Sequence, residues 1–356
     1  MEKVKWTFLT EEQIWGGFEE PAGDFAPCKA TDFAKLLGCY LNSDNGRCVW
    51  WSASKTTNDY VRSVYSDGTK NSDYPDERAL VARPALPFSE LLKISPNGVR
   101  GINAKGILTY TSTLEYPKTA VEPGSELEKE LNGLEKAKKL QKYGKPIRVD
   151  SVPTEYRSEN WEKRYTERKL ERCMHDGKKY VKMSAFVPDS SDKHYKLDSG
   201  TRYTQGKEYW VKVELVTFLI LKEKKTGKEV AVIEDGAYSG IQMNHSNNYD
   251  GNLDASDGGR YLNECFAEDV MQQSPEGNLE INQLFAELYK GNIDKEILRK
   301  KLKELNDRAT TLEESAAFES ALDAGYAEYN LKIQKDQKEL ASKKKAVSSK
   351  IDGMEF

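Results

Sequence analysis

The fold is decided by the sequence ATDFAKLLG at Ala30–Gly38, which is followed by WWSAS at 50–54, VYSDG at 64–68 and VARPAL at 81–86. The first stretch predicts a short helix, because Thr31 is a good N-cap and Gly38 stops the apolar residues that follow at helical spacing. The stretches around Trp50 and Val64 predict strands, and Asp67-Gly68 predicts a tight turn. We therefore expect one helix followed by short strands near the N-terminus.

Length and composition restrict the kind of protein. The chain has 356 residues, 31% of them charged, and a formal net charge of -4. Because the two signs nearly cancel, nothing in the overall charge indicates binding to nucleic acid or to an anionic membrane. The N-terminus lacks the apolar stretch of a secretory signal, and no apolar run is long enough to span a bilayer. We expect a protein of the cytoplasm or of a phage particle.

The middle of the chain, residues 96–273, predicts a second β-rich body after the first one at 1–95. Strands are expected at 107–110, 180–183, 209–221 and 229–233, because short apolar runs alternate there with Gly-containing turns. Helices are expected at 125–143 and 261–271.

The last part of the chain, residues 274–356, predicts helices instead of strands. Asp294 is expected to cap a helix in which Leu298, Leu302 and Leu305 begin an apolar seam with spacings of four and three residues. Such a seam is covered either by a neighbouring segment, as in a helical hairpin, or by another chain, as in a coiled coil. Self-association through these helices is therefore one expectation.

The four stretches of the first part resemble the closing half of an uncharacterised bacterial and prophage domain family with the C-type-lectin-like fold, which formylglycine-generating enzymes also use. In the middle part, Glu115–Val121 resembles the opening strand of that family, Gly206–Glu214 its central strand and Tyr261–Phe266 its second helix. Closing elements thus precede opening ones. The resemblance implies an α+β protein with a β-rich C-type-lectin-like body, either permuted or duplicated, and a C-terminal helical hairpin or coiled coil.

Binding residues are expected in the loop between Trp51 and Tyr74, which combines tyrosines with small polar residues in the manner of a recognition surface. The other reading is an ordinary surface loop. The expected binding residues are Trp51, Asn58, Tyr60, Tyr65 and Tyr74. Three further residues are expected to be structural: Arg62 and Arg83, which would bond backbone carbonyls or Asp67, and Asp67 itself.

Catalytic and metal-binding motifs are scarce in the sequence. It has no Gly-x-Ser-x-Gly elbow, no phosphate-binding loop and neither of the Glu-Pro-Asn and Trp-Asn-Asp signatures of calcium-dependent lectins. The acidic stretch Asn247–Asp254 is either a solvated turn or a metal loop without its closing glutamate. Cys39 and Cys48 are the only cysteines near enough in sequence to stand for the pair of a formylglycine-type oxidase, and buried structural thiols are the alternative.

These observations favour a non-catalytic protein that recognises a protein or glycan partner through polar and aromatic loops. No cofactor, metal site or catalytic residue is assigned. Two alternatives stay open: a phage or mobile-element protein that inhibits a host factor by steric binding, and a thiol-dependent oxidase.

Overall fold

The structure is a computed structural model. It describes residues 4–20, 25–56, 60–77, 79–142, 146–149, 168–187, 194–240, 242–244, 249–270, 284, 287–288, 291 and 293–307. The chain divides into two compact units, Glu2–Gln273 and Ser274–Phe356.

The first unit has one main hydrophobic core, to which residues from Trp6 to Ala267 contribute. Trp50 and Leu86, from the part expected at 1–95, share this core with Tyr209 and Phe266, from the part expected at 96–273. The two parts therefore fold as one body, and no boundary between compact units lies near residue 95.

A large antiparallel sheet runs through this unit, and its central strand is β12 (Glu208–Lys222). One edge of β12 pairs with β6 (Leu108–Ala120), whereas the other pairs with β11 (Lys178–Ser184) near its start and with β13 (Glu229–Ile233) near its end. The strand is long because residues 209–221 are rich in β-branched and aromatic side chains. The remaining strands of the sheet are β4 (Ala85–Pro87), which pairs with β13, β5 (Val99–Ile102), β7 (Gln141–Lys142) and β10 (Arg172–His175).

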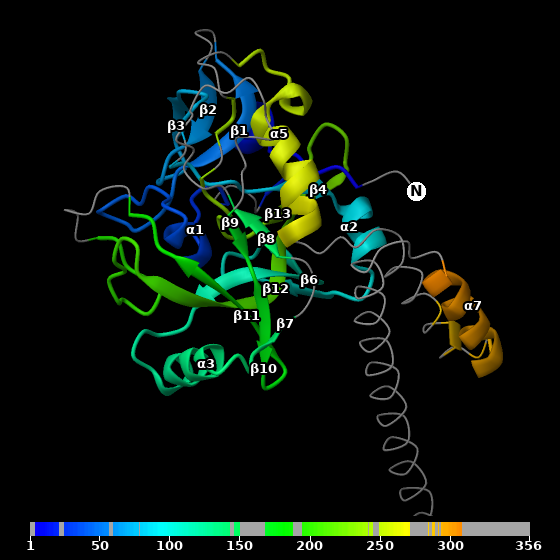
Figure 1. Ribbon diagram of the computed structural model, residues 1–356. Helices are drawn as coiled ribbons and strands as arrows, with labels where there is room; N and C mark the ends of the chain where they lie inside the picture. Colours follow the sequence, from blue (N-terminus) through cyan, green and yellow to red (C-terminus); the bar gives the residue numbers. More distant parts are fainter. Residues whose placement is uncertain are drawn as a thin grey trace, which may run out of the picture. The chain divides into compact units, whose positions relative to one another are not determined.

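A smaller antiparallel sheet contains β1 (Trp50–Lys55), β2 (Val61–Val64) and β3 (Lys70–Asp73), in that order. In Figure 1 it lies at the opposite end of the unit from α3 (Glu126–Lys136) and β10. Strand β1 begins with the buried Trp50 and Trp51, whereas β3 is polar throughout and forms an edge of the sheet. A separate pair is formed by β8 (Ile147–Val149) and β9 (Arg168–Leu170).

Helix ends follow the capping residues of the sequence. In α1 (Asp32–Leu36) the hydroxyl of Thr31 accepts from the Ala34 N–H at 3.1 Å, and Gly38 leaves the helix with a φ of +95°. Ser125 caps α3 in the same way. The helix ends at Lys136 and not at residue 143 as expected, and the chain continues to β7. The other helical segments of this unit are η1 (Gln13–Gly17), α2 (Phe88–Ile94), η3 (Leu253–Ala255), α5 (Asp257–Arg260) and η4 (Tyr261–Val270).

The second unit contains α7 (Lys295–Asp307), which begins as expected at Asp294. The Asp294 carboxylate accepts from the N–H groups of Glu296 and Ile297 at 2.9 and 2.8 Å. Leu298 and Leu302 are buried, as the seam requires, whereas the continuation of the seam beyond residue 307 lies outside the described residues. Among the helices that the structure describes, none combines the length and the apolarity that crossing a membrane requires.

Candidate binding surface

The surface with the composition of a recognition site lies at one end of the small sheet. The pairing of Val61 with Asp73 places Tyr60 opposite Tyr74, just beyond the two strands. The ring centroids are 4.8 Å apart with the rings tilted by 54°, and Tyr74 is 56% exposed. A hydrogen bond with Tyr74 raises the pKa of Tyr60 above its usual value. The pair therefore presents two amphipathic rings.

Polar contacts within the sheet fix the strand that carries Tyr74. The Asp73 carboxylate accepts from the Ser63 hydroxyl and from the Asn71 amide, the latter at 3.0 Å. Burial raises the pKa of Asp73, while the hydrogen bond from Ser63 acts in the opposite direction. These contacts bind β3 to β2 through side chains as well as through the backbone.

A second group of polar contacts braces the outer face of β2 and β3. Arg62 Nε donates to Glu11 at 3.1 Å and Lys70 Nζ to the same carboxylate at 2.9 Å, and these two contacts outweigh partial burial and lower the pKa of Glu11. Lys70 also lies 5.3 Å from the ring centroid of Trp15. The N-terminal segment is thereby fastened onto the small sheet.

The expected structural residues have different roles. Arg62 bonds the carbonyl of Asn71 at 3.5 Å besides Glu11, but Asp67 is not its partner: the Asp67 carboxylate accepts from the N–H and the hydroxyl of Thr69, at 2.9 and 2.6 Å, and closes its own turn. The turn chemistry of the sequence was a signal for this contact, because a short Asp side chain reaches the backbone two residues on before it reaches another strand.

Arg83 is fully buried and donates to three backbone carbonyls. Its guanidinium bonds Ile233 at 2.9 Å, Phe25 at 2.8 Å and Glu234 at 2.9 Å, which are contacts of the kind expected from the sequence. It also lies 5.1 Å from the ring centroid of Trp50. The arginine thus joins segments from both halves of the first unit.

The expected binding residues do not all lie on this surface. Trp51 is 0% exposed, so the expectation that it contacts a partner is wrong: residues 50–52 at the start of β1 are all buried, and the Trp51 backbone N–H bonds the carbonyl of Val81 at 3.1 Å. Tyr65 is half-buried at the other end of β2, about 16 Å from Tyr60 at the rise of a strand. Asn58 lies outside the described residues. Tyr60 and Tyr74 are therefore the members that the structure brings together.

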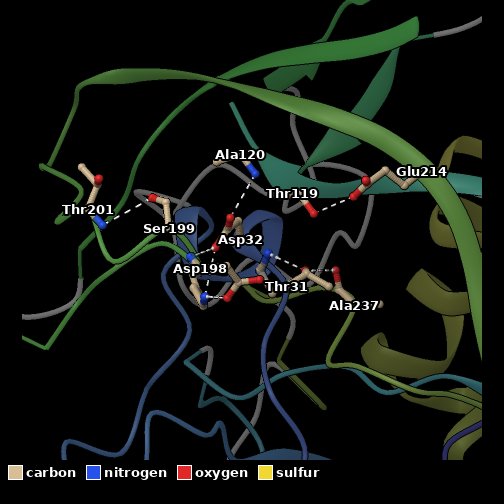
Figure 2. A network of polar contacts seen from close by, with 11 residues as sticks. Thr31, Asp32, Thr119, Ala120, Asp198, Ser199, Thr201, Glu214 and Ala237 are labelled. Atoms are coloured by element: carbon tan, nitrogen blue, oxygen red, sulfur yellow. Dashed lines mark hydrogen bonds and ion pairs between the residues drawn. The ribbon is translucent and has the colours of Figure 1, made fainter. Parts of the chain in front are cut away.

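A buried ionic network, which the sequence did not point out, surrounds α1 (Figure 2). The Asp32 carboxylate accepts from the Ala120 N–H at 3.0 Å, the Asp198 N–H at 2.8 Å and Lys35 Nζ at 2.9 Å. Lys35 also donates to the Asp198 carboxylate at 2.5 Å. Burial alone would lower the pKa of Lys35, but Asp32 and Asp198 together raise it. The spacing of Asp32 and Lys35 on one helix face was the only signal in the sequence.

Cys39 and the described part of the acidic loop show no reactive or metal-binding arrangement. Burial raises the pKa of Cys39 to about 12, and the pKa of Cys48 is raised through its hydrogen bond with Cys28. Within the described part of the chain no cluster of three or more His, Cys, Asp or Glu side chains could hold a metal ion. In the acidic loop, Asp254 pairs with Lys5 at 2.5 Å, and residues 247 and 248 lie outside the described residues.

The arrangement as a whole is a braced sheet with a polar edge strand and a tyrosine pair at its end, in which Tyr74 is exposed and Tyr60 half-buried. Its side chains can stack and form hydrogen bonds, but none of them is an activated nucleophile. Comparison of the chain with protein-family models, with curated proteins and with solved structures finds no significant match.

Proposed function

We propose that the first unit is a non-catalytic binding module with a C-type-lectin-like fold, which recognises a protein or glycan partner through Tyr60, Tyr74 and the polar strand β3. The observation that carries this proposal is the tyrosine pair on a braced sheet, with Tyr74 exposed and Tyr60 half-buried. Paired aromatic rings with polar hydroxyl edges suit the faces of sugar rings and the side chains of a peptide alike.

Rigidity supports binding because a surface that is already ordered loses little conformational entropy when a partner docks. The side chains of Ser63, Asn71 and Asp73 hold the two strands beneath the tyrosines, and each tyrosine has only two side-chain torsions to fix. The polar edge strand β3 adds backbone groups at the border of the sheet, where a partner strand could pair.

The position of the closing strand supports a permuted C-type-lectin-like fold over two incomplete copies. The stretch at 81–86 ends in β4, which pairs with β13, and β13 pairs with the central strand β12. Elements that resemble the closing and opening halves of the family thus contribute to one sheet and one core, as a single permuted domain requires.

Parallel binding to glycan and peptide arrays tests this function. We expect the wild-type chain to bind a restricted set on one array, and Tyr60→Ala plus Tyr74→Ala to weaken that binding about 30-fold or more, the effect of losing an interface hot spot of about 2 kcal/mol. Leu108→Ala is the matched control, because Leu108 is an exposed apolar residue of β6 outside this surface. Unchanged affinity of a folded double variant would refute the proposal.

A further inference from the structure

Two thiols from distant parts of the sequence meet inside the first unit. The Sγ atoms of Cys28 and Cys48 are 3.4 Å apart, and the Cys48 N–H bonds the Cys28 carbonyl at 3.3 Å. In an antiparallel pair, such a backbone hydrogen bond corresponds to α-carbons about 5.5 Å apart, which is within the disulfide range of about 4.4–6.8 Å. The sulfurs need to approach by only about 1.4 Å to reach the disulfide length of about 2.0 Å, a movement that side-chain rotation can supply.

The surroundings of the pair leave space for both sulfurs. A Cβ on Gly236 would lie 3.1 Å from Sγ of Cys48 and 2.5 Å from a methyl group of Val81, so any larger residue there would displace the thiol. Gly236 is held in place by its N–H, which donates to the Lys29 carbonyl at 2.7 Å. The backbone at Gly236 is thus held next to the Cys48 sulfur, and the missing side chain of this glycine leaves room for it.

The two thiols differ in their readiness to ionise. The hydrogen bond from Cys48 lowers the pKa of Cys28, and the nearby Arg83 guanidinium acts in the same direction against burial. The same hydrogen bond, together with burial, raises the pKa of Cys48. Cys28 is therefore the nucleophile of the pair, and it is also the one with measurable exposure, 4% against 0% for Cys48.

We propose that Cys28 and Cys48 are a redox-active dithiol that a peroxide oxidises to an intramolecular disulfide. In the first step the Cys28 thiolate attacks one oxygen of hydrogen peroxide, the O–O bond breaks, and the hydroxide that leaves takes up a proton to become water. In the second step Cys48 loses its proton and attacks the sulfur of the Cys28 sulfenic acid, and a second water leaves. Two thiols and one peroxide thus yield one disulfide and two waters.

The disulfide would close a loop that contains all of α1. Cys28 precedes the helix, and Cys48 lies just before β1, whose strand leads into the small sheet. Oxidation therefore joins the start of the helical segment covalently to the base of that sheet, and it should raise the thermal midpoint of the first unit by several degrees. This proposal is independent of the binding function.

Peroxide titration of the reduced full-length chain tests the proposal. One equivalent should remove about 2 Da from the intact mass, lower the number of titratable thiols in denaturant from five to three, and give a tryptic peptide that links Cys28 to Cys48. Dithiothreitol should reverse all three changes.

Cys39→Ser is the matched control, because Cys39 is a buried thiol inside the same loop, and it should oxidise like the wild type. Cys48→Ser should stop at the sulfenic acid, which a dimedone probe traps at Cys28. Five remaining thiols after oxidation of the folded wild-type chain would overturn the proposal, and so would a disulfide in any other pairing. Because the mapping uses the wild-type protein, the test does not depend on the folding of a variant.

Discussion

Removing the carboxylate of Asp32 should destabilise the first unit more than any exposed ion pair of the chain. Asp32 is 1% exposed and accepts three hydrogen bonds, two from backbone N–H groups and one from Lys35. In Asp32→Ala the buried Ala120 N–H loses its acceptor, which costs about 1–3 kcal/mol, and breaking a buried ion pair costs about 3–5 kcal/mol. The two costs overlap, because one desolvated site is counted in both. Lys35 also keeps Asp198 as a partner, so we expect a loss of about 2–4 kcal/mol and not the sum of the two costs.

Urea unfolding followed by tryptophan fluorescence measures this loss, because Trp50 and Trp51 are buried in the same unit. The matched control is Glu126→Ala, which removes a carboxylate with the same spacing to a lysine, Lys129, at the surface of α3. The Glu126 side chain is 91% exposed, so the control should change the free energy of unfolding by less than about 0.5 kcal/mol. If Asp32→Ala lowered the free energy of unfolding no more than this control does, the contacts of Asp32 would not stabilise the first unit.

The pH dependence gives an independent check of the network. The pKa of Lys35 is raised in the folded state, so the protein binds the proton more tightly when folded. The contribution of Lys35 is then fully present below its unfolded pKa of about 10.4 and is lost as the pH rises through the higher folded value. Stability should fall in this alkaline range in the wild type, and Lys35→Met should remove that part of the fall.

Two further predictions concern other parts of the chain. The raised pKa of Asp73 means that its contribution to stability is present below about pH 4 and is lost as the pH rises through the folded-state pKa. Asp73→Asn should therefore be more stable than the wild type at pH 7, by less than about 1 kcal/mol, and should unfold at a higher urea concentration. At pH 3 the two proteins should unfold at the same urea concentration. In α7, Leu298→Asp plus Leu302→Asp buries two unpaired charges and should remove helical ellipticity without unfolding the first unit. The mass from light scattering then shows what covers this apolar face. A wild-type dimer that becomes a monomer in the variant indicates a coiled coil, whereas a monomer in both proteins indicates a hairpin.

Local features of the fold were readable from the sequence because they depend on neighbouring residues. The caps at Thr31, Ser125 and Asp294 and the strand at 209–221 follow from side-chain type and spacing alone. The length of the helix after Ser125 was overestimated, because leucine and lysine spacing continues past Lys136 while the backbone already turns towards the sheet. Periodicity indicates that a helix forms, but contacts elsewhere decide where it ends.

The candidate sites depend on contacts between distant residues, and these leave no local pattern. Asp32 and Asp198 are 166 positions apart, and Cys28 meets Cys48 across 20 positions. Trp51 was misplaced for the same reason, since its burial depends on the core of the whole unit and not on the polar residues beside it in sequence. Only Tyr60 and Tyr74 could be combined from the sequence, because they flank two strands that a short turn connects.

Stability and binding should be separable in this protein, because the contacts that carry them lie in different places. Arg83 bonds Phe25 and lies over Trp50, so the buried contacts gather where the segment before α1 meets β1. Tyr60 and Tyr74 stand beyond the far ends of β2 and β3, and truncating them opens no core cavity. Asp32→Ala should therefore lower the free energy of unfolding while the folded fraction binds with unchanged affinity. The tyrosine variants should weaken binding and leave the free energy of unfolding unchanged. If Asp32→Ala weakened binding as strongly as the tyrosine changes, the surface would depend on the core around α1, and the proposed site would extend towards that helix.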